Sequence, residues 1–395
     1  MTLDNIFDKF LDNEAIFSNR SVLTVGFTPK NIPHRENEIN ELGRILAPSL
    51  KGDKPSNIFV YGRTGTGKSL VTRLVGDQLE KRSLANGNKI KVVYLNCKMK
   101  TADTEYRLLA SLSKAFGVNV PFTGLPTDKV YEIFFDCIDS SKQSVIIIVD
   151  EIDALIQKNG DEILYNLTRI NQDLKNASVT LIGITNDLGF IDSLDPRIKS
   201  CLSEEELIFP PYNAIQLQDI LRNRSKQAFR EQCLDSGVIE KCAALAAQEH
   251  GDARRALDLL RVAGELAERA GNEKVEILHV DSAEEKIDID RTGELVKAQP
   301  KQSQAVLWSI IKIGKKNNIE TGDIIDKYHE VCRNNGIKPL TQRRISDLIA
   351  ELNLFGIINT KVISKGRYGR TRVVSMNTSE HVYGKLMTLL QKNFL

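Results

Sequence analysis

Short hydrophobic runs alternate with segments of helical periodicity in the first half of the chain. Runs rich in β-branched residues cover 58–61, 91–97, 144–153 and 179–187. The third run, SVIIIVDEID, is uninterrupted up to its acidic end, as expected for a strand buried on both faces of a parallel sheet. Because helix-length segments separate the runs, the pattern predicts an α/β fold built on a parallel sheet.

From residue 210 to about 280 the pattern is helical throughout. Apolar residues recur at three- and four-residue spacing in AIQLQDILRNRSKQAF, VIEKCAALAAQEH and DARRALDLLRVAGELAERAGN. Asp252 is predicted to cap the last of these helices and Gly271 to end it. The region predicts a small helical domain, and the charged stretch 282–302, which contains Pro300, predicts a junction to a final domain.

The C-terminal part combines helices with a predicted β-hairpin. The amphipathic helices SQAVLWSIIKIGKK and TGDIIDKYHEVCRNNG precede a third, PLTQRRISDLIAELNLFGII. Thr321 is predicted to cap the second helix and Thr341 the third. Strands at IINTKVI and RVVSM then flank a glycine-rich basic turn. This order predicts a helix-turn-helix followed by a hairpin, which is a winged helix.

Polar and basic side chains occupy the positions with which a winged helix contacts DNA. The start of its last helix reaches base edges and phosphates in the major groove, and here it carries Thr341, Gln342, Arg343 and Arg344. A cationic turn between strands suits a DNA backbone or minor groove. The candidates there are Lys365, Arg367, Tyr368, Gly369, Arg370 and Arg372. A solvated turn and a protein-interaction module are the alternatives, but no acidic residue occurs from Asn359 through Asn377.

The amino-acid composition indicates which class of protein this is. With 395 residues, 41% hydrophobic and 27% charged, the chain is expected to form two or three globular domains. It has no apolar run of membrane-spanning length, and its start lacks the organisation of a secretory signal. The six cysteines form no CxxC pair, which favours reduced thiols over disulfides or a metal site. We therefore expect a cytoplasmic protein with no membrane partner.

Charge is unevenly distributed along the chain. The formal net charge is +2, but the segment from Lys297 to Leu395 contains 17 Lys and Arg against 7 Asp and Glu. A basic C-terminal domain on an acidic body indicates a polyanionic partner for that domain. A merely soluble basic surface is the alternative that charge alone leaves open.

A phosphate-binding motif follows the first hydrophobic run. Residues 62–69, here called the P-loop, match GxxxxGK[ST] between a predicted strand and a predicted helix. Its glycines let backbone N–H groups face phosphates, and the helix N-terminus adds a favourable dipole. Lys68 is expected to reach the β- and γ-phosphates and Ser69 to ligate Mg²⁺. The predicted nucleotide contacts are Gly62, Arg63, Thr64, Gly65, Thr66, Gly67, Lys68, Ser69 and Leu70.

Polar side chains also follow the third and fourth runs. Asp150 and Glu151 end the third run and Asn186 follows the fourth, where parallel strands present ligand-binding residues. Asp150 is predicted to ligate Mg²⁺ and Glu151 to deprotonate the attacking water. Asn186 is predicted to hold that water or a γ-phosphate oxygen. An asparagine after a strand is commonly a turn residue, but its place in this series favours the catalytic role.

These motifs in this order, followed by GDARRALDLLR at 251–261, resemble the AAA+ ATPases. The resemblance implies that Arg254 is a sensor-2 arginine acting on the γ-phosphate, with a solvated helix charge as the alternative. Cys201 stands where related oligomeric ATPases carry a trans-acting arginine, and Arg197 is the close substitute. A slow, largely monomeric nucleotide switch is therefore favoured over a hydrolysing ring.

Two further segments resemble the Orc1/Cdc6 replication initiators, and the archaeal members in particular. FTPKNIPHRENEINELGRIL contains a PHRE-type sequence that borders the adenine in that family, which implies nucleotide contacts for His34 and Arg35. FPPYNAIQLQDILRNR resembles the entry into the family's lid, where Tyr212 would help to enclose the base. The resemblance covers nearly the whole chain.

The resemblance implies three domains. These are an AAA+ core over 1–207, a helical lid over 208–290 and a winged-helix DNA-binding domain over 296–395. The core would include a helical insertion at about 98–138 that is able to contact DNA. Lys98, Lys100 and Arg107 are the basic candidates in it, with a solvated helix face as the alternative.

The function implied by the resemblance is an ATP-dependent replication initiator. It would be a weak ATPase with ATP or ADP and Mg²⁺ as cofactors, binding duplex origin DNA at the nucleoid and recruiting the replicative MCM helicase. Paralogous initiator subunits are further partners that the family allows. Two other functions stay open: an AAA+ motor of the clamp-loader or branch-migration type, and a DNA-binding regulator in which the nucleotide is structural.

Overall fold

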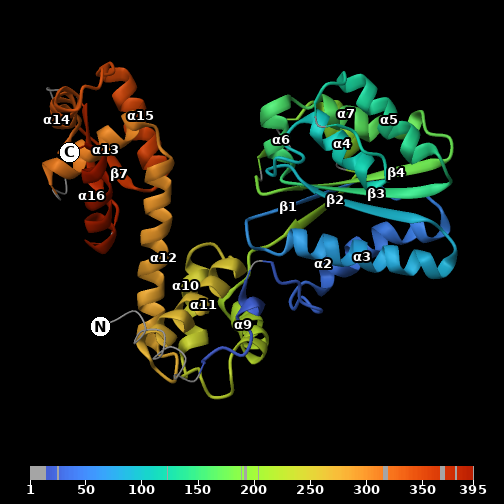
Figure 1. Cartoon of the computed structure of the whole chain (residues 1–395), viewed down its shortest axis with the longest axis horizontal. Coiled ribbons are helices and arrows are strands. Elements are labelled where there is room, and N and C mark those ends of the chain that lie inside the picture. Colours follow the sequence, from blue (N-terminus) through green and yellow to red (C-terminus); the bar gives the residue numbers. More distant parts are fainter. Residues whose placement is uncertain are drawn as a thin grey trace. The chain divides into compact units, whose positions relative to one another are not determined.

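The computed structural model describes residues 15–24, 26–121, 123–187, 189–190, 194–202, 204–314, 319–364, 370–378 and 380–394. The chain forms two compact units, Met1–Ile277 and Leu278–Leu395 (Figure 1). The first unit contains a parallel sheet and a helical lid. The second contains helices and a small antiparallel sheet.

A five-stranded sheet with the strand order β2-β3-β4-β1-β5 forms the base of the first unit. All neighbouring strands run parallel, and every residue of β3 is buried. The predicted parallel α/β sheet is therefore confirmed. The strands are β1 (Ile58–Gly62), β2 (Ile90–Asn96), β3 (Gln143–Asp150), β4 (Ala177–Thr185) and β5 (Glu205–Phe209).

The pattern of hydrophobic runs did not predict strand β5. It is an edge strand hydrogen-bonded to β1, and its residues Glu205, Glu206 and Ile208 are exposed. A short strand with two exposed glutamates lacks the apolar run by which buried strands are recognised. Its position matters for the site, because β5 leads from the sheet into the lid.

Helices cover both faces of the sheet (Figure 1). One face carries α2 (Glu36–Leu46) and α3 (Lys68–Asn86); the other carries α4 (Glu105–Ala115), α5 (Thr127–Asp139), α6 (Ile152–Asn159) and α7 (Glu162–Arg169). Because successive strand residues point to opposite faces, Val60 joins the buried cluster on one face and Phe59 that on the other. The shorter elements are η2 (Ala47–Lys51), η3 (Ile170–Gln172) and α8 (Pro196–Leu202).

The predicted insertion at 98–138 forms α4 and α5. Their residues Leu108, Leu112 and Phe134 belong to the buried cluster on the sheet, so both helices are part of its cover. Arg107, one of the candidates for DNA contact, forms an ion pair with Asp103 at 2.7 Å. Lys100 is exposed.

The lid comprises α9 (Ala214–Ala228), α10 (Val238–Gln248) and α11 (Ala253–Ala270). Asn213 and Gln216 form a capping box at the start of α9, in which each side chain accepts the backbone N–H of the other. Asp252 accepts N–H groups at the start of α11, and Gly271 ends that helix with a φ of 75°. The predicted cap and stop of α11 are therefore confirmed.

Residues 15–24 pack on the lid, although the prediction placed them in the core. Glu268 accepts the N–H of Ile16 at 3.1 Å and pairs with Arg20 through its other oxygen. Phe17 stacks on Phe229 with ring centroids 4.7 Å apart. After the short helix η1 (Arg20–Leu23) the chain passes to α2 of the core. We call the described part of this passage, residues 26–35, the first crossing. The return from core to lid, residues 210–213, is the second crossing.

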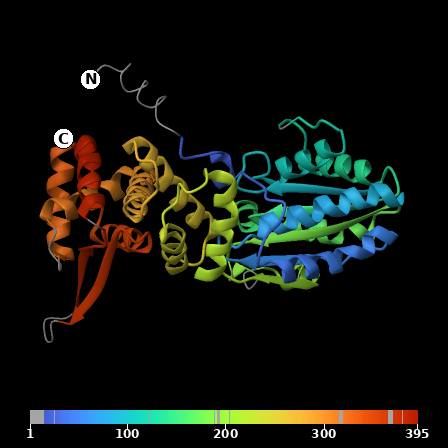
Figure 2. The same cartoon turned by 90° about the horizontal axis from the view of Figure 1, so that it is seen from below.

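The second unit is a winged helix. Its helices are α12 (Ile277–Ala298), α13 (Lys301–Ile313), α14 (Thr321–Asn334), α15 (Gln342–Leu354) and α16 (Glu380–Phe394). Its antiparallel sheet has the order β6-β8-β7, with β6 (Ile319–Glu320), β7 (Ile358–Ser364) and β8 (Arg370–Met376). The β7–β8 hairpin extends away from the helices of this unit (Figure 2). The predicted helix-turn-helix and hairpin are therefore confirmed, whereas β6 and α16 were not predicted.

One local prediction in this region was wrong. Thr321 does not cap α14: the cap position is Glu320, and the Thr321 hydroxyl donates to the carbonyl of Arg372 at 2.8 Å. The charged stretch predicted as a junction is helical up to Ala298, where α12 ends. Among the described helices, none is long and apolar enough to cross a membrane.

Candidate nucleotide and DNA sites

The P-loop curls between β1 and α3. Gly65 and Gly67 have φ values of 69° and 93°, which side chains with a Cβ rarely adopt. Thr66 between them is buried, and its hydroxyl donates to the Arg63 carbonyl at 2.8 Å. A Cβ at Gly62 would lie 2.4 Å from the carbonyl oxygen of Phe209, so the loop also needs glycine where it meets β5. The predicted phosphate cradle therefore has the glycine-dependent backbone that such a loop requires.

Lys68 lies at the centre of the site. Its Nζ donates to the carbonyls of Gly62 and Arg63, both at 2.7 Å, and to Asn186 Oδ1 at 2.8 Å. Parallel pairing of β1 with β4 brings Asn186, just after β4, to the edge where the P-loop starts. Burial lowers the pKa of Lys68, the charge of Asp150 opposes this shift and the charge of Arg254 adds to it, so that the pKa is about 8. The ammonium is thus oriented by three oxygens in a poorly solvated position.

This pKa predicts a pH dependence of nucleotide affinity. Lys68 is charged below about pH 8 and loses its proton above it, so the affinity for an anionic phosphate should be constant up to that pH. Above it, affinity should fall by about tenfold per pH unit, since only the protonated fraction binds well. Titrating ADP in EDTA between pH 7 and 9.5 measures this without a metal ion in the site.

Lys68→Ala is the control for that titration, because its residual affinity should not change over the same interval. Constant wild-type affinity up to pH 9.5 would contradict the lowered pKa. The ammonium would then titrate near its ordinary value of about 10.4.

Asp150 is held by two donors at the end of β3. One carboxylate oxygen accepts the N–H of Glu151 at 2.9 Å, and the other accepts the Tyr94 hydroxyl. Burial and this bond raise the pKa of Tyr94 to about 12, and the Arg73 guanidinium stacks on its ring at 3.4 Å. The prediction missed Tyr94, because a tyrosine inside a β-strand reads as an ordinary strand former. With the Ser69 hydroxyl, the Asp150 carboxylate supplies the oxygen ligands that Mg²⁺ prefers.

Glu151 adopts an unusual backbone conformation. Its φ of 54° lies in the left-handed region, which costs a residue with a Cβ about 1–3 kcal/mol. Its Oε2 lies 2.9 Å from Lys98 Nζ. Lys98, a predicted DNA contact, therefore pairs with the predicted catalytic base, a contact that the sequence pattern did not indicate.

The lid meets the P-loop at the start of α11. The Ala253 N–H donates to the Gly65 carbonyl at 3.3 Å, and Asp252 packs where a Cβ of Gly65 would stand. Arg63 and His250 are hydrogen-bonded at 2.8 Å across the same junction. Arg254 is exposed, and its charge lies close enough to Lys68 to lower the pKa of that residue. The predicted sensor-2 arginine thus lies beside the P-loop.

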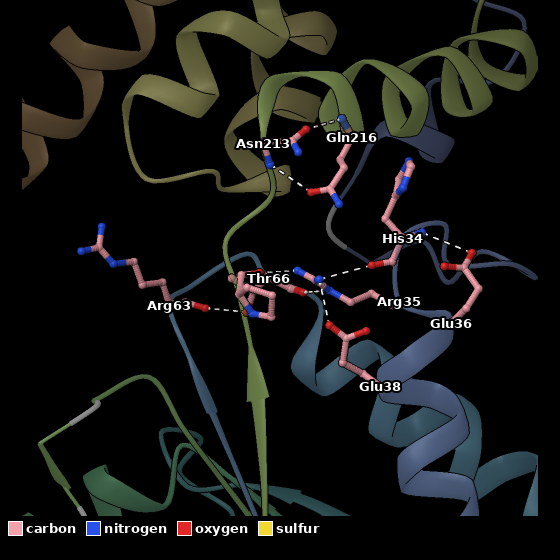
Figure 3. Close-up of polar contacts among 9 residues, drawn as sticks. His34, Arg35, Glu36, Glu38, Arg63, Thr66, Asn213 and Gln216 are labelled. Atoms are coloured by element: carbon pink, nitrogen blue, oxygen red, sulfur yellow. Dashed lines mark hydrogen bonds and ion pairs between the residues drawn. The ribbon is translucent and has the colours of Figure 1, made fainter.

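In the PHRE segment, the donors of Arg35 are bonded to acceptors of the protein itself. Its side chain is 2% exposed, and four hydrogen bonds join it to protein acceptors (Figure 3). This differs from the predicted direct contact with the nucleotide. His34 pairs with Asp219 of α9 at 3.1 Å. Tyr212 is buried, and its ring centroid lies 3.9 Å from the Cζ of Arg35.

Cys201 and Arg197, at and near the position where related ATPases carry a trans-acting arginine, both make contacts within the chain. Cys201 accepts a hydrogen bond from Asn57 at its carbonyl. Arg197, the close substitute, is 68% exposed and makes two bonds of 3.0–3.1 Å with Asp195. These bonds lower the pKa of Asp195 to about 2.

The predicted DNA contacts of the winged helix fall into three groups. Thr341 caps α15, and Gln342 and Arg343 are exposed in its first turn. Arg344 lies within 3.8 Å of Asp347 and 3.7 Å of Glu351.

The second group is Arg372, which donates to the Ser346 carbonyl at 3.4 Å and so links β8 to α15. Arg370 is the first residue of β8. The third group is Lys365, Arg367, Tyr368 and Gly369, which lie outside the described residues.

Comparison with protein families gives three matches along the chain. An AAA domain matches residues 52–189, a Cdc6 AAA+ ATPase-type lid domain matches 218–285, and the C-terminal winged helix domain of CDC6 matches 294–383. The three matches fall on strands β1–β4 of the sheet, on the lid helices together with the start of α12, and on the winged helix.

Similar proteins match nearly the whole chain. The ORC1-type DNA replication protein of Thermococcus onnurineus is 51% identical over 385 residues, covering 96% of this chain and 92% of that protein. The ORC1-type DNA replication protein 1 of Methanosarcina mazei is 51% identical and covers 95% and 91%. The solved structure of Aeropyrum pernix ORC1 in complex with DNA is 45% identical with a TM-score of 0.83, covering 96% and 98%. This chain belongs to the ORC1-type DNA replication proteins, the Orc1/Cdc6 family of AAA+ ATPases.

Proposed function

We propose that this protein binds ATP or ADP with Mg²⁺ at the P-loop and hydrolyses ATP slowly. The observation that carries the proposal is the bond between Lys68 Nζ and Asn186 Oδ1, at the carboxyl edge of the sheet where Asp150 and Arg254 also lie. An ammonium, two carboxylates, an amide and an arginine are the groups that phosphoryl transfer to water requires.

The roles of the residues follow from their chemistry. Lys68 and Arg254 bind and neutralise the terminal phosphate, Asn186 orients it or the water, and the Glu151 carboxylate accepts the proton of the water. Ser69 and Asp150 would hold Mg²⁺, which when bound neutralises phosphate charge. Two features support slow turnover. Lys98 forms an ion pair with the carboxylate of Glu151, which is the proposed base. A cysteine stands at position 201, where related ring-forming ATPases carry an arginine.

We also propose that the winged helix binds duplex origin DNA and that the bound nucleotide is a slow conformational switch for this binding. The exposed first turn of α15 and the excess of Lys and Arg after Lys297 support it. So does the similarity to an ORC1 protein whose structure contains DNA. Recruitment of the replicative MCM helicase, cooperation with paralogous subunits and association with the nucleoid are further parts of this proposal.

Footprinting tests the proposed function. Wild-type protein should protect origin DNA at concentrations that leave unrelated DNA of the same length unprotected, and Lys68→Ala should lose the dependence on ATP. Equal protection of both DNAs would favour the nucleotide-containing regulator. ATP hydrolysis faster than about one turnover per second and stimulated by DNA would favour the motor.

Arg343 and Arg344 should differ in their effect on DNA affinity. Arg343 has no ion pair with another described residue, whereas Arg344 shares its charge with two carboxylates. Arg343→Ala should weaken binding by about tenfold and reduce the salt dependence by about one phosphate contact. Arg344→Ala should cost less than about threefold, because its charge is already partly neutralised. Anisotropy of a labelled origin duplex at several salt concentrations measures both, and equal losses would contradict this assignment.

A further inference from the structure

The Arg35 guanidinium donates to four acceptors in the first unit, three backbone carbonyls and one carboxylate. Its Nε donates to the Thr66 carbonyl at 2.9 Å, and its Nη2 donates to the Pro210 carbonyl. Its Nη1 donates to the His34 carbonyl at 3.3 Å and to Glu38 Oε1 at 3.0 Å. Figure 3 shows these acceptors converging on the side chain from different elements.

The three carbonyls belong to the P-loop and to the two segments that connect core and lid. Thr66 is in the P-loop, between the two glycines with positive φ. His34 is in the first crossing and is tied to the lid through Asp219 of α9. Pro210 is in the second crossing, directly after β5. One planar group therefore joins the phosphate-binding loop to both covalent connections between core and lid.

Packing makes this junction tight. Tyr212 of the second crossing lies against the guanidinium, with its ring centroid 3.9 Å from the Arg35 Cζ. Its hydroxyl is 3.1 Å from where a Cβ of Gly67 would be. Because an unsatisfied buried donor is destabilising, a shift of the P-loop that left the crossings behind would be opposed by the lost bonds of Arg35.

We propose that Arg35 is a positioning residue that couples nucleotide occupancy of the P-loop to the orientation of the lid, without contacting the nucleotide itself. The proposal rests on the proposed nucleotide binding. The planar guanidinium suits the role, because each of its three nitrogens bonds a different one of the three carbonyls. The single nitrogen of a lysine would have to lie within bonding distance of all three carbonyls at once. Glu38 balances the buried charge but lies on α2, outside the P-loop and the crossings.

Hydrogen exchange of the full chain, with and without ADP, tests the coupling. In the wild type, ADP should slow exchange at P-loop amides and also at Tyr212, Asn213 and the first crossing, by about tenfold, within the usual range of coupling between sites. In Arg35→Lys, ADP should still slow exchange in the P-loop but change the crossings less than about twofold. Glu38→Gln is the matched control: the guanidinium keeps its three carbonyl acceptors, so the crossings should respond as in the wild type.

Each other outcome overturns the proposal. Wild-type protection confined to the P-loop would show that occupancy does not reach the crossings, and this measurement needs no variant. If folded Arg35→Lys protein shows the same ADP-dependent slowing of exchange at the crossings as the wild type, Arg35 does not carry the coupling. Folded Arg35→Lys that binds no ADP at tenfold the wild-type saturating concentration would make Arg35 a direct ligand. If ADP leaves the wild-type P-loop itself unprotected, it is the proposed nucleotide site that fails.

Discussion

Lys68→Ala is expected to weaken the binding of both ATP and ADP by about a hundredfold at pH 7. Lys68 is the ammonium that three oxygens orient at the carboxyl edge of the sheet. A hydrogen bond to a charged group contributes about 1.5–3 kcal/mol, and 1.4 kcal/mol corresponds to a factor of ten in affinity. Calorimetric or fluorescence titration of each nucleotide measures the loss.

Lys89→Ala is the matched control, since it removes the same charge from the first unit. Its Nζ contacts Ser141 rather than any residue of the site, so nucleotide affinity should stay at the wild-type value. Lys68→Ala should remain folded, because the substitution removes an ammonium whose lowered pKa shows that burial disfavours its charge. Wild-type affinity in folded Lys68→Ala would contradict the proposed phosphate site.

Glu151→Gln is expected to reduce ATP hydrolysis by about a hundredfold or more while changing ATP affinity less than about threefold. The amide has the shape of the carboxylate but cannot accept the proton of the attacking water, and general base catalysis contributes about 10²–10⁴-fold. Phosphate release under single-turnover conditions reports the chemical step, and an ATP titration of the same protein reports binding.

Lys98→Ala separates loss of the base from loss of its ion pair. It leaves the carboxylate in place and removes the ammonium 2.9 Å away. Because the Lys98 side chain is 59% exposed, solvent screens this pair. A screened pair contributes about 0.2–1 kcal/mol, so hydrolysis should rise by no more than about fivefold. Hydrolysis by Glu151→Gln at the wild-type rate would exclude Glu151 as the base, and a Lys98→Ala protein as inactive as Glu151→Gln would show that catalysis needs the pair.

The motifs were predictable because they depend on local geometry. The glycines of the P-loop, the acidic end of β3 and the cap of α11 each lie within a few residues of the backbone they shape. Periodicity located most helices of the lid and winged helix for the same reason, since burial of one face imposes a spacing on its own element. Strand β5 was not predicted, because an exposed edge strand is not required to be apolar on both faces.

Contacts between distant segments were not predictable in the same way. Tyr94 holds Asp150 from a neighbouring strand, and Lys98 reaches Glu151 from the loop after β2. Arg35 was predicted to touch the nucleotide, yet its donors are taken by carbonyls of the P-loop and the crossings. Every residue has a backbone carbonyl, so the sequence does not indicate which carbonyl a side chain will bond. Only the folded structure shows the partner.

The sequence by itself therefore determined which chemical groups this protein has and which elements carry them: a glycine-rich P-loop, acidic strand ends, an arginine at the start of α11 and a basic winged helix. Only the tertiary structure decided how these groups are paired. It placed residues 15–24 on the lid, joined Glu151 to Lys98, and put Arg35 between the P-loop and both crossings. The physical reason is that motif and periodicity follow from bonds and burial along one segment, whereas pairing depends on where remote segments meet after the core has packed.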